Sequence, residues 1–370
     1  MRKWTIIIFW IAGVYCSLPF IKKEESRLYS KLLYYCKKDS SLEAIEMYVK
    51  LLEIDEDQDK INNPFVRVKI ASYLELPPYK IEKFNGDSAV GLFSPTFSHD
   101  SKLITGTKRF PPLGRKGSAL YIFDFKTKKF LYSFSLDTIQ ILYGFAWTKD
   151  TLFIVGREKK DSIRNFYRVV KEGDIFHVKR VPCEQRIQKG FFDIYKDNFI
   201  IFEGVKEGEW HRDLYMLNMS NGEVTRLTND IFLEATPKIE GDKLIFFSNT
   251  GGFSFDIFMA DITPKGLRNV HPLTKTYSDE YFPSIDSQKE KIIFSTEYQV
   301  FLKSLKSKED FPLRLTFEKM CSFRMGDLSS NGRYVILEGL CKKPQFYIID
   351  LGSPIPLSLL KRKLLKGGKK

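Results

Sequence analysis

The sequence predicts a mainly β protein with a small N-terminal helical segment, because one pattern recurs six times after residue 75. The pattern is an apolar residue, a polar turn and an alternating strand, as in "TFSHDSKLITG" and "DLSSNGRYVILEG". Its apolar marker positions lie 43–50 residues apart, at Phe97, Trp147, Ile194, Ile239, Ile285 and Leu328. Aromatic residues make up 15% of the chain, which favours strand packing. This period predicts a six-bladed β-propeller of four-stranded blades.

The first twenty residues, "MRKWTIIIFWIAGVYCSLPF", predict an export signal. A basic head precedes an apolar run that ends near Leu18 and is shorter than the ~20 residues that span a bilayer. We expect cleavage before Ser17; a retained membrane anchor and lipid modification at Cys16 remain alternatives. The protein is therefore expected in the periplasm or elsewhere in the cell envelope.

Residues 21–75 are predicted to be helical. In "SLEAIEMYVKLLEI" apolar residues follow a 3.6 period, and Ser40 with Glu43 forms a capping box. Asn63 is the expected cap of a further helix, with Pro64 at its first position. The segment weakly resembles one tetratricopeptide unit, at positions Tyr35, Ala44 and Tyr48. We expect a helical cap rather than a peptide-binding groove, because one degenerate unit cannot stack into a solenoid.

Each marker hairpin is followed by a third strand with an aromatic residue at one fixed place, at Tyr121, Tyr167, Tyr215, Phe258, Phe301 and Tyr347. Fourth strands follow in five copies, and the sixth copy lacks one. The stretch "PYKIEKFNGDS" before the first copy is similar to "PLRLTFEKMCS" at the end of the fifth. We therefore expect the N-terminal strand to pair with "QFYIIDL" and close the ring, which removes exposed sheet edges. The propeller would span residues 76–352, with a basic tail over 353–370.

The repeats resemble the propeller repeats of the TolB family. "SPTFSHDSKLI" is similar to that family's Ser-Pro-x-Phe-Ser-x-Asp-Gly-x-x-Ile turn, with Ser101 in place of glycine. "DIFMADI" and "EVTRLTND" are similar to its third and fourth strands. The resemblance covers about 275 residues. It implies a cell-envelope protein with a TolB-like propeller, but not TolB's role in the Tol–Pal system. TolB carries a mixed α/β domain where this chain has about 50 helical residues.

We expect no catalysis, no metal and no cofactor. The sequence has no GxSxG motif and no glycine-rich phosphate loop. Propeller lyases bring several histidines to the central channel, and this chain has four, at His99, His177, His211 and His271. Only His211 is expected on a ligand-binding face. The alternative is a propeller-fold hydrolase or lyase that acts on an exported polymer.

The net charge of +13 comes from 59 basic and 46 acidic residues. It favours an acidic or polar partner or a solvated surface. We expect no nucleic-acid binding, because the basic residues do not alternate with aromatic residues as in a stacking platform.

The most favoured function is a non-catalytic scaffold that binds an envelope protein or a cell-wall polymer. Connections from second to third strands and from fourth to first strands share one face, and the first four blades carry the longest of these loops. Arginine and tryptophan often anchor interfaces. The expected partner-binding residues are Arg109, Arg115, Arg157, Trp210, His211 and Arg212.

Cys321 and Cys341 are a candidate disulfide. Cys321 lies between the fourth strand of blade five and the first of blade six, and Cys341 follows the second strand of blade six. Both therefore fall on the same face of one blade, and a bond requires Cα atoms within about 7 Å.

Overall fold

The computed structural model describes residues 22–367, apart from 56–57, 85–90, 110–117, 136–138, 159, 174, 253, 307–311, 318–320 and 342. The predicted export signal therefore lies outside the described residues. The chain divides into two compact units, one formed by the chain up to Lys80 together with Ser353–Lys370, the other by Ile81–Gly352. No helix among the described residues is long and apolar enough to cross a membrane.

The first unit is helical. Residues 22–37 form a helix, followed by α2 (Ser41–Ile54), α3 (Pro64–Tyr73) and, from the other end of the chain, α4 (Leu357–Gly367). Their apolar faces share one core that includes the fully buried side chains of Leu32, Tyr48, Leu51, Val66 and Leu360. The tail predicted over residues 353–370 thus contains a helix that the sequence analysis did not anticipate.

The caps of these helices differ in one respect from those expected. Asn63 caps α3 by accepting a hydrogen bond from the Val66 N–H at 3.3 Å, and Pro64 is the first helical residue. Ser40 stands at the N-cap of α2, but its side chain makes no capping hydrogen bond. The capping box predicted for Ser40 and Glu43 is therefore wrong. The tetratricopeptide resemblance is not confirmed, since the segment shows only short helices.

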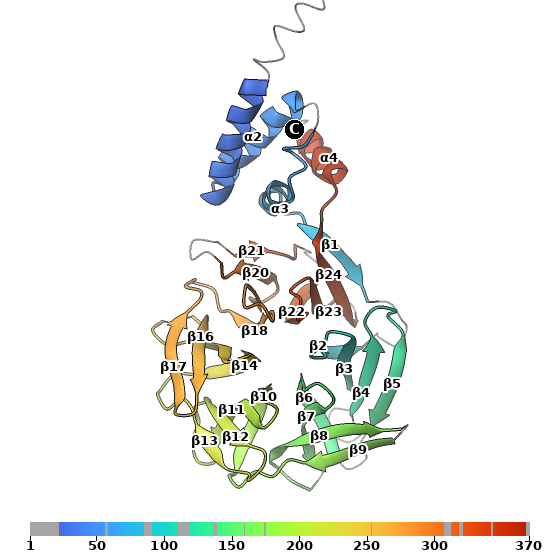
Figure 1. The fold of residues 1–370 in the computed structure, drawn as a ribbon, viewed down its shortest axis with the longest axis vertical. Helices are drawn as coiled ribbons and strands as arrows, with labels where there is room; N and C mark the ends of the chain where they lie inside the picture. The colour runs from blue at the N-terminus through green and yellow to red at the C-terminus, as the bar shows by residue number, and fades with distance from the viewer. Residues whose placement is uncertain are drawn as a thin grey trace, which may run out of the picture. The chain divides into compact units, whose positions relative to one another are not determined.

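The second unit is a six-bladed propeller of four-stranded antiparallel sheets, as predicted, and Figure 1 shows its blades following one another around a central axis. Blades one to three comprise β2 (Leu92–Phe97), β3 (Leu103–Arg109), β4 (Ser118–Asp124) and β5 (Phe130–Ser135); β6 (Ile139–Trp147), β7 (Leu152–Glu158), β8 (Arg164–Glu172) and β9 (Ile175–Arg180); and β10 (Ile187–Tyr195), β11 (Phe199–Lys206), β12 (Asp213–Asn218) and β13 (Val224–Arg226).

Blades four and five comprise β14 (Glu234–Glu240), β15 (Lys243–Ser248), β16 (Asp256–Thr263) and β17 (Gly266–Pro272); and β18 (Tyr281–Ile285), β19 (Lys291–Ser295), β20 (Val300–Ser304) and β21 (Leu313–Arg314). Blade six comprises β22 (Ser322–Leu328), β23 (Tyr334–Leu340), β24 (Pro344–Pro354) and the N-terminal strand β1 (Tyr79–Lys83). The predicted ring closure is confirmed, and the Phe84 N–H donates to the Phe346 carbonyl at 2.8 Å beside it.

The repeated turn after each first strand has a local chemical cause. In blade one the Ser98 hydroxyl accepts the Leu103 N–H at 2.9 Å and donates to Asp100 at 2.8 Å. Ser101 takes a φ of 56° there, a left-handed conformation in which glycine is usual. Blade six repeats the contact, since the Ser329 hydroxyl accepts the Tyr334 N–H at 2.8 Å. The serine and the acidic or amide residue of the motif therefore fix the hairpin.

The inner strand of every blade carries an irregularity in its pairing with the second strand. In five blades it coincides with a positive φ, at Ser94, Gly144, Thr236, Phe282 and Met325. A bulge bends a strand and increases its twist. This shared feature lets the inner strands curve past one another at the axis.

Candidate partner-binding face

The loops of one propeller face carry the most exposed large apolar side chains of the described propeller. This face, called here the loop face, is formed by the connections from second to third strands and from fourth to first strands, which an antiparallel blade places on the same side. Among the described residues of this face, four large apolar side chains are exposed, and they come from blades three to five. They are Trp210, Ile231, Tyr277 and Tyr298, which are 87, 82, 107 and 59% exposed.

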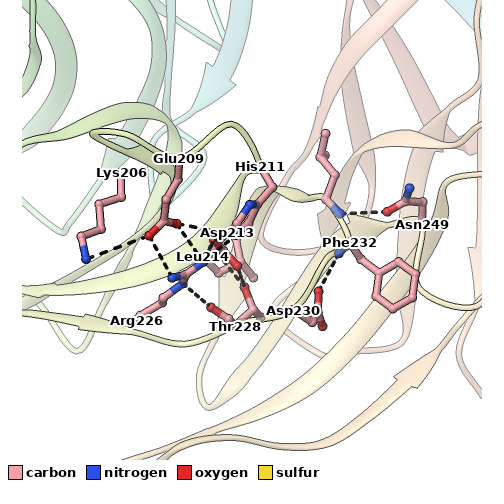
Figure 2. A network of polar contacts seen from close by, with 11 residues as sticks. Lys206, Glu209, His211, Asp213, Leu214, Arg226, Thr228, Asp230, Phe232 and Asn249 are labelled. Atoms are coloured by element: carbon pink, nitrogen blue, oxygen red, sulfur yellow. Dashed lines mark hydrogen bonds and ion pairs between the residues drawn. The ribbon is translucent and has the colours of Figure 1, made fainter.

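Trp210 stands on a loop that is anchored on both sides by one arginine. Figure 2 shows Glu209, His211 and Asp213 converging on Arg226 of β13. The Nη2 atom of Arg226 lies 2.8 Å from His211 Nε2 and 3.1 Å from Glu209 Oε2. The same atom pairs with the buried carboxylate of Asp213. Guanidinium groups can only donate, so His211 Nε2 is the acceptor in its contact with Arg226.

Positive and negative groups oppose one another in this cluster. Burial raises the pKa of Asp213, and the Arg226 guanidinium opposes that shift. Glu209, His211 and Asp213 offer ligand atoms within 4.8 Å of one another, as in a metal site. Arg226 already supplies the positive charge that a metal would bring, and it bonds to all three. We therefore interpret the cluster as a structural brace for the loop.

The brace leaves the Trp210 indole uncovered. Its ring contacts the His211 ring edge-on, with centroids 5.8 Å apart, and 87% of the residue stays exposed. A large amphipathic ring on a fixed loop loses little conformational entropy when a partner covers it. This is the typical setting of an interface anchor.

The loop that carries Tyr277 is also held in place. The Thr276 N–H donates to Asp256 at 3.0 Å, and the Ser254 hydroxyl donates to the Thr276 carbonyl at 2.8 Å. The Phe255 N–H donates to Asp279 at 3.0 Å. Two neighbouring loops of blade four are thereby joined, and Tyr277 between these contacts projects into solvent.

Of the six residues predicted for partner binding, four have described side chains, and these come from blades two and three. Trp210 is exposed, His211 belongs to the brace, and the Arg212 Nη1 lies 3.4 Å from Glu203 Oε1. Arg157 lies in blade two, where it donates to Gln140 at 3.0 Å. Arg109 ends β3, but its side chain lies outside the described residues, as does Arg115 altogether.

The propeller axis holds polar groups that the sequence analysis missed. The residue just before each marker position lines an axial cavity, which gives a ring of Thr96, Ala146, Asp193, Lys238, Ser284 and Asp327, and all of these but Ala146 are polar. These residues line a cavity of about 120 Å³, and a second cavity of about 50 Å³ adjoins them along the axis. The fixed offset from the markers was the signal that could have identified this ring.

Lys238 is the cation of this ring. Its Nζ lies 3.4 Å from Asp327 Oδ1. Burial lowers the pKa of Lys238, but the carboxylates of Asp327 and Asp193 outweigh that effect and raise it. His99 lines the same cavity, although the sequence placed it only in a turn. His177 and His271 lie on the outer strands β9 and β17, as predicted.

Two opposite junctions between blades each contain an aspartate and a glutamate in equivalent positions. Between blades three and four, Asp193 accepts the Ile239 N–H and Glu203 accepts the Thr236 N–H, each at 2.8 Å. Between blades six and one, Asp327 and Glu338 occupy the equivalent places. They accept the Phe97 and Ser94 N–H groups at 2.8 and 2.9 Å. We call these two pairs the junction carboxylates.

The disulfide considered from the sequence is present in the structure. Cys321 and Cys341 are joined, with their Cα atoms 4.5 Å apart. The bond links the entry to β22 with the end of β23, within blade six.

No family model matches the sequence, and no curated protein matches it significantly. Among solved structures, TolB from Acinetobacter baumannii is 17% identical with a TM-score of 0.50, over 70% of this chain and 65% of that one. A putative TolB from Agrobacterium tumefaciens is 13% identical, with a TM-score of 0.47 over 76% and 92% of the chains. An oligogalacturonate lyase from Vibrio parahaemolyticus is 10% identical, with a TM-score of 0.46 over 76% and 94%. At these identities the likeness to TolB shows the propeller fold alone.

Proposed function

We propose that this chain is a non-catalytic binding protein of the cell envelope whose propeller engages a partner through the loop face of blades three to five. The observation that carries the proposal is the exposed Trp210 on its braced loop. Ile231, Tyr277 and Tyr298 extend the apolar contact across the neighbouring blades. The predicted export signal and the TolB resemblance support the proposed envelope location.

The chemistry of this sector favours a polar partner over a strongly acidic one. Only two basic residues, Arg212 and Lys275, accompany the anchors on these loops. The same loops carry six acidic residues, at Glu207, Glu209, Asp230, Asp279, Glu280 and Glu297, of which only Glu280 is fully buried. An aromatic anchor surrounded by hydrogen-bonding groups suits an envelope protein or a neutral cell-wall polymer.

The alternative of a hydrolase or lyase has less support. His177 and His271 lie on outer strands, and His211 is bonded to Arg226. In the described part of the channel, Lys238 is paired with Asp327. A proton-transfer role needs a group that is available to a substrate, and these contacts make the groups less available.

The test begins with a pull-down from envelope extracts, with the full chain as bait, followed by calorimetry with the purified partner. We expect Trp210→Ala to weaken binding about 30-fold, which corresponds to roughly 2 kcal/mol for an interface anchor. Ile175→Ala is the matched control, because Ile175 is 64% exposed at the turn between β8 and β9, on the opposite face.

The proposal fails if Ile175→Ala weakens binding and Trp210→Ala does not, since the contact would then lie on the other face. It also fails if both variants bind like the unchanged chain. Circular dichroism of each variant checks that the fold is intact.

A further inference from the structure

Three carboxylates converge in the helical unit. Glu25 comes from the helix over residues 22–37, Asp55 follows α2, and Asp59 belongs to the turn before α3. One oxygen of each lies within 4.8 Å of the other two. The Lys60 ammonium contacts Glu25 and lies 3.3 Å from Asp59. The cluster therefore holds three acidic side chains and one basic side chain.

A separate observation shows that Asp55 is short of a partner. The residue is only 4% exposed. Its Oδ2 accepts the Ile61 N–H at 2.9 Å, while Oδ1 has no hydrogen-bond partner. Leaving a buried charged oxygen unpartnered costs more than the roughly 1–3 kcal/mol of a neutral group. Burial raises the pKa of Asp55, and the carboxylates of Asp59 and Glu25 raise it further.

Described contacts on both sides of residues 56–57 position Asp55 and Ile61. The Asp55 N–H donates to the Leu51 carbonyl at 2.9 Å at the end of α2. The Ile61 carbonyl accepts a hydrogen bond from the Tyr48 hydroxyl at 3.3 Å. Gln58 has a φ of 57°, which closes the turn between these contacts. The three carboxylates thus remain together although they repel one another.

We propose that Glu25, Asp55 and Asp59 bind a divalent cation, and that this cation is calcium. The donor set consists of carboxylate oxygens, which hard cations prefer. Calcium accepts six to eight oxygen ligands in flexible geometry, so water completes its shell at the exposed Asp59 side. A divalent ion would offset the repulsion among the carboxylates and give Asp55 Oδ1 a partner. Glu56 and Asp57 lie outside the described residues and are not part of the proposed site.

Lys60 competes with the metal in this arrangement. Its ammonium contacts Glu25 and Asp59 from a side chain that is 22% exposed. Cation entry therefore requires the Lys60 ammonium to leave the carboxylates. The effect of Lys60 on calcium affinity therefore distinguishes a metal site from a carboxylate cluster whose charge is balanced by lysine alone.

The experiment is calcium titration of the full chain by calorimetry, and terbium luminescence excited through tyrosine. Tyr29 lies close to the site. Burial is the main cause that raises the pKa of Tyr29, and the charges of Asp59 and Asp55 raise it further. We expect one site with a dissociation constant on the order of 10⁻⁵ to 10⁻³ M. Asp55→Asn should weaken binding at least tenfold, and Lys60→Gln should tighten it. Glu53→Gln, an exposed carboxylate on α2, should bind like the unchanged chain.

The proposal is overturned if calcium binds without saturation, or if Asp55→Asn and Glu53→Gln bind equally well. It is also overturned if Lys60→Gln leaves the affinity unchanged, because the ammonium would then not occupy the metal position. Should Asp55→Asn fail to fold, Glu25→Gln replaces it with the same expected tenfold loss. Calcium should also raise the melting temperature of the unchanged chain relative to a chelator-treated sample. The control Glu53→Gln should show the same rise, and a rise in the control but not in the unchanged chain is not expected.

Discussion

Two buried glutamates occupy the same place in neighbouring blades, five residues before the marker positions. Glu234 accepts a hydrogen bond from the Ser248 hydroxyl at 3.0 Å, and Glu280 accepts one from Thr276 at 3.0 Å. Burial raises the pKa of each to about 7. Both groups therefore hold a proton in the folded protein at a pH where the unfolded chain has already released it.

The pH dependence of stability follows from these two residues. Their ordinary pKa is 4.5, so between about 4.5 and 7 the folded state binds more protons than the unfolded state. The free energy of unfolding contributed by these groups should then fall as the pH rises through that range. We expect Glu280→Gln to make the urea midpoint less dependent on pH between 5 and 8.

Glu297→Gln is the control for this measurement, because Glu297 is an exposed residue of the same blade. It should keep the pH dependence of the unchanged chain. Equal slopes for Glu280→Gln and the unchanged chain would contradict the assignment of the raised pKa to Glu280.

Among single residues, the sequence was informative where the residue type and its place in a loop were unusual. Trp210 was predicted to lie on a loop because it belongs to a long insertion between a second and a third strand, and its exposure is confirmed. The ring position of Lys238 was missed, because a lysine in an alternating strand is normally a solvated residue. Its role depends on six inner strands meeting at the axis, and that proximity is a property of the closed propeller.

At the scale of the elements, the repeat spacing predicted the blades and the closing strand well. The marker hairpins are stabilised by local contacts, such as Ser98 with Leu103, which leave a clear sequence pattern. Helix α4 was missed because its lysines and arginine suggest a solvated tail. The apolar residues Leu357, Leu360 and Leu364, at helical spacing, in fact join the core of the helical unit.

The closing strand should be indispensable to the propeller. Deletion of residues 77–86 would remove β1 and leave β24 as an exposed edge in blade six. It would also remove Phe84, which is fully buried. We expect the truncated chain to melt at a clearly lower temperature, or not to fold, as measured by calorimetry. A melting curve that coincides with that of the full chain would contradict the closure.

At the scale of the whole molecule, the junction carboxylates give the ring an approximate two-fold pattern within its six-fold repeat. Blades three and six each supply an aspartate from the inner strand and a glutamate from the second strand. An arginine accompanies each glutamate, since Arg324 Nε lies 3.2 Å from Glu338 Oε1 as Arg212 lies near Glu203. The sequence spacing alone did not predict this pattern.

Each junction should contribute independently to stability. Glu203→Ala leaves the Thr236 N–H without its partner, and Glu338→Ala does the same to the Ser94 N–H. Each change should cost about 1–3 kcal/mol. The double variant should show the sum in urea unfolding, because the two sites lie at opposite junctions and share no partner. Exposed Glu297→Gln again serves as a control, and a double variant no weaker than either single one would contradict independence.

The pairing of β1 with β24 has a consequence for the chain while it is being translated. About 260 residues separate the two strands, which takes roughly 13 to 50 s to translate at ~5–20 residues per second. Throughout that interval β1 has no neighbour, and the early helices lack the Leu360 side chain that completes their core. For most of its synthesis, a nascent chain of this protein therefore lacks both the strand that pairs with β1 and the C-terminal part of the helical core.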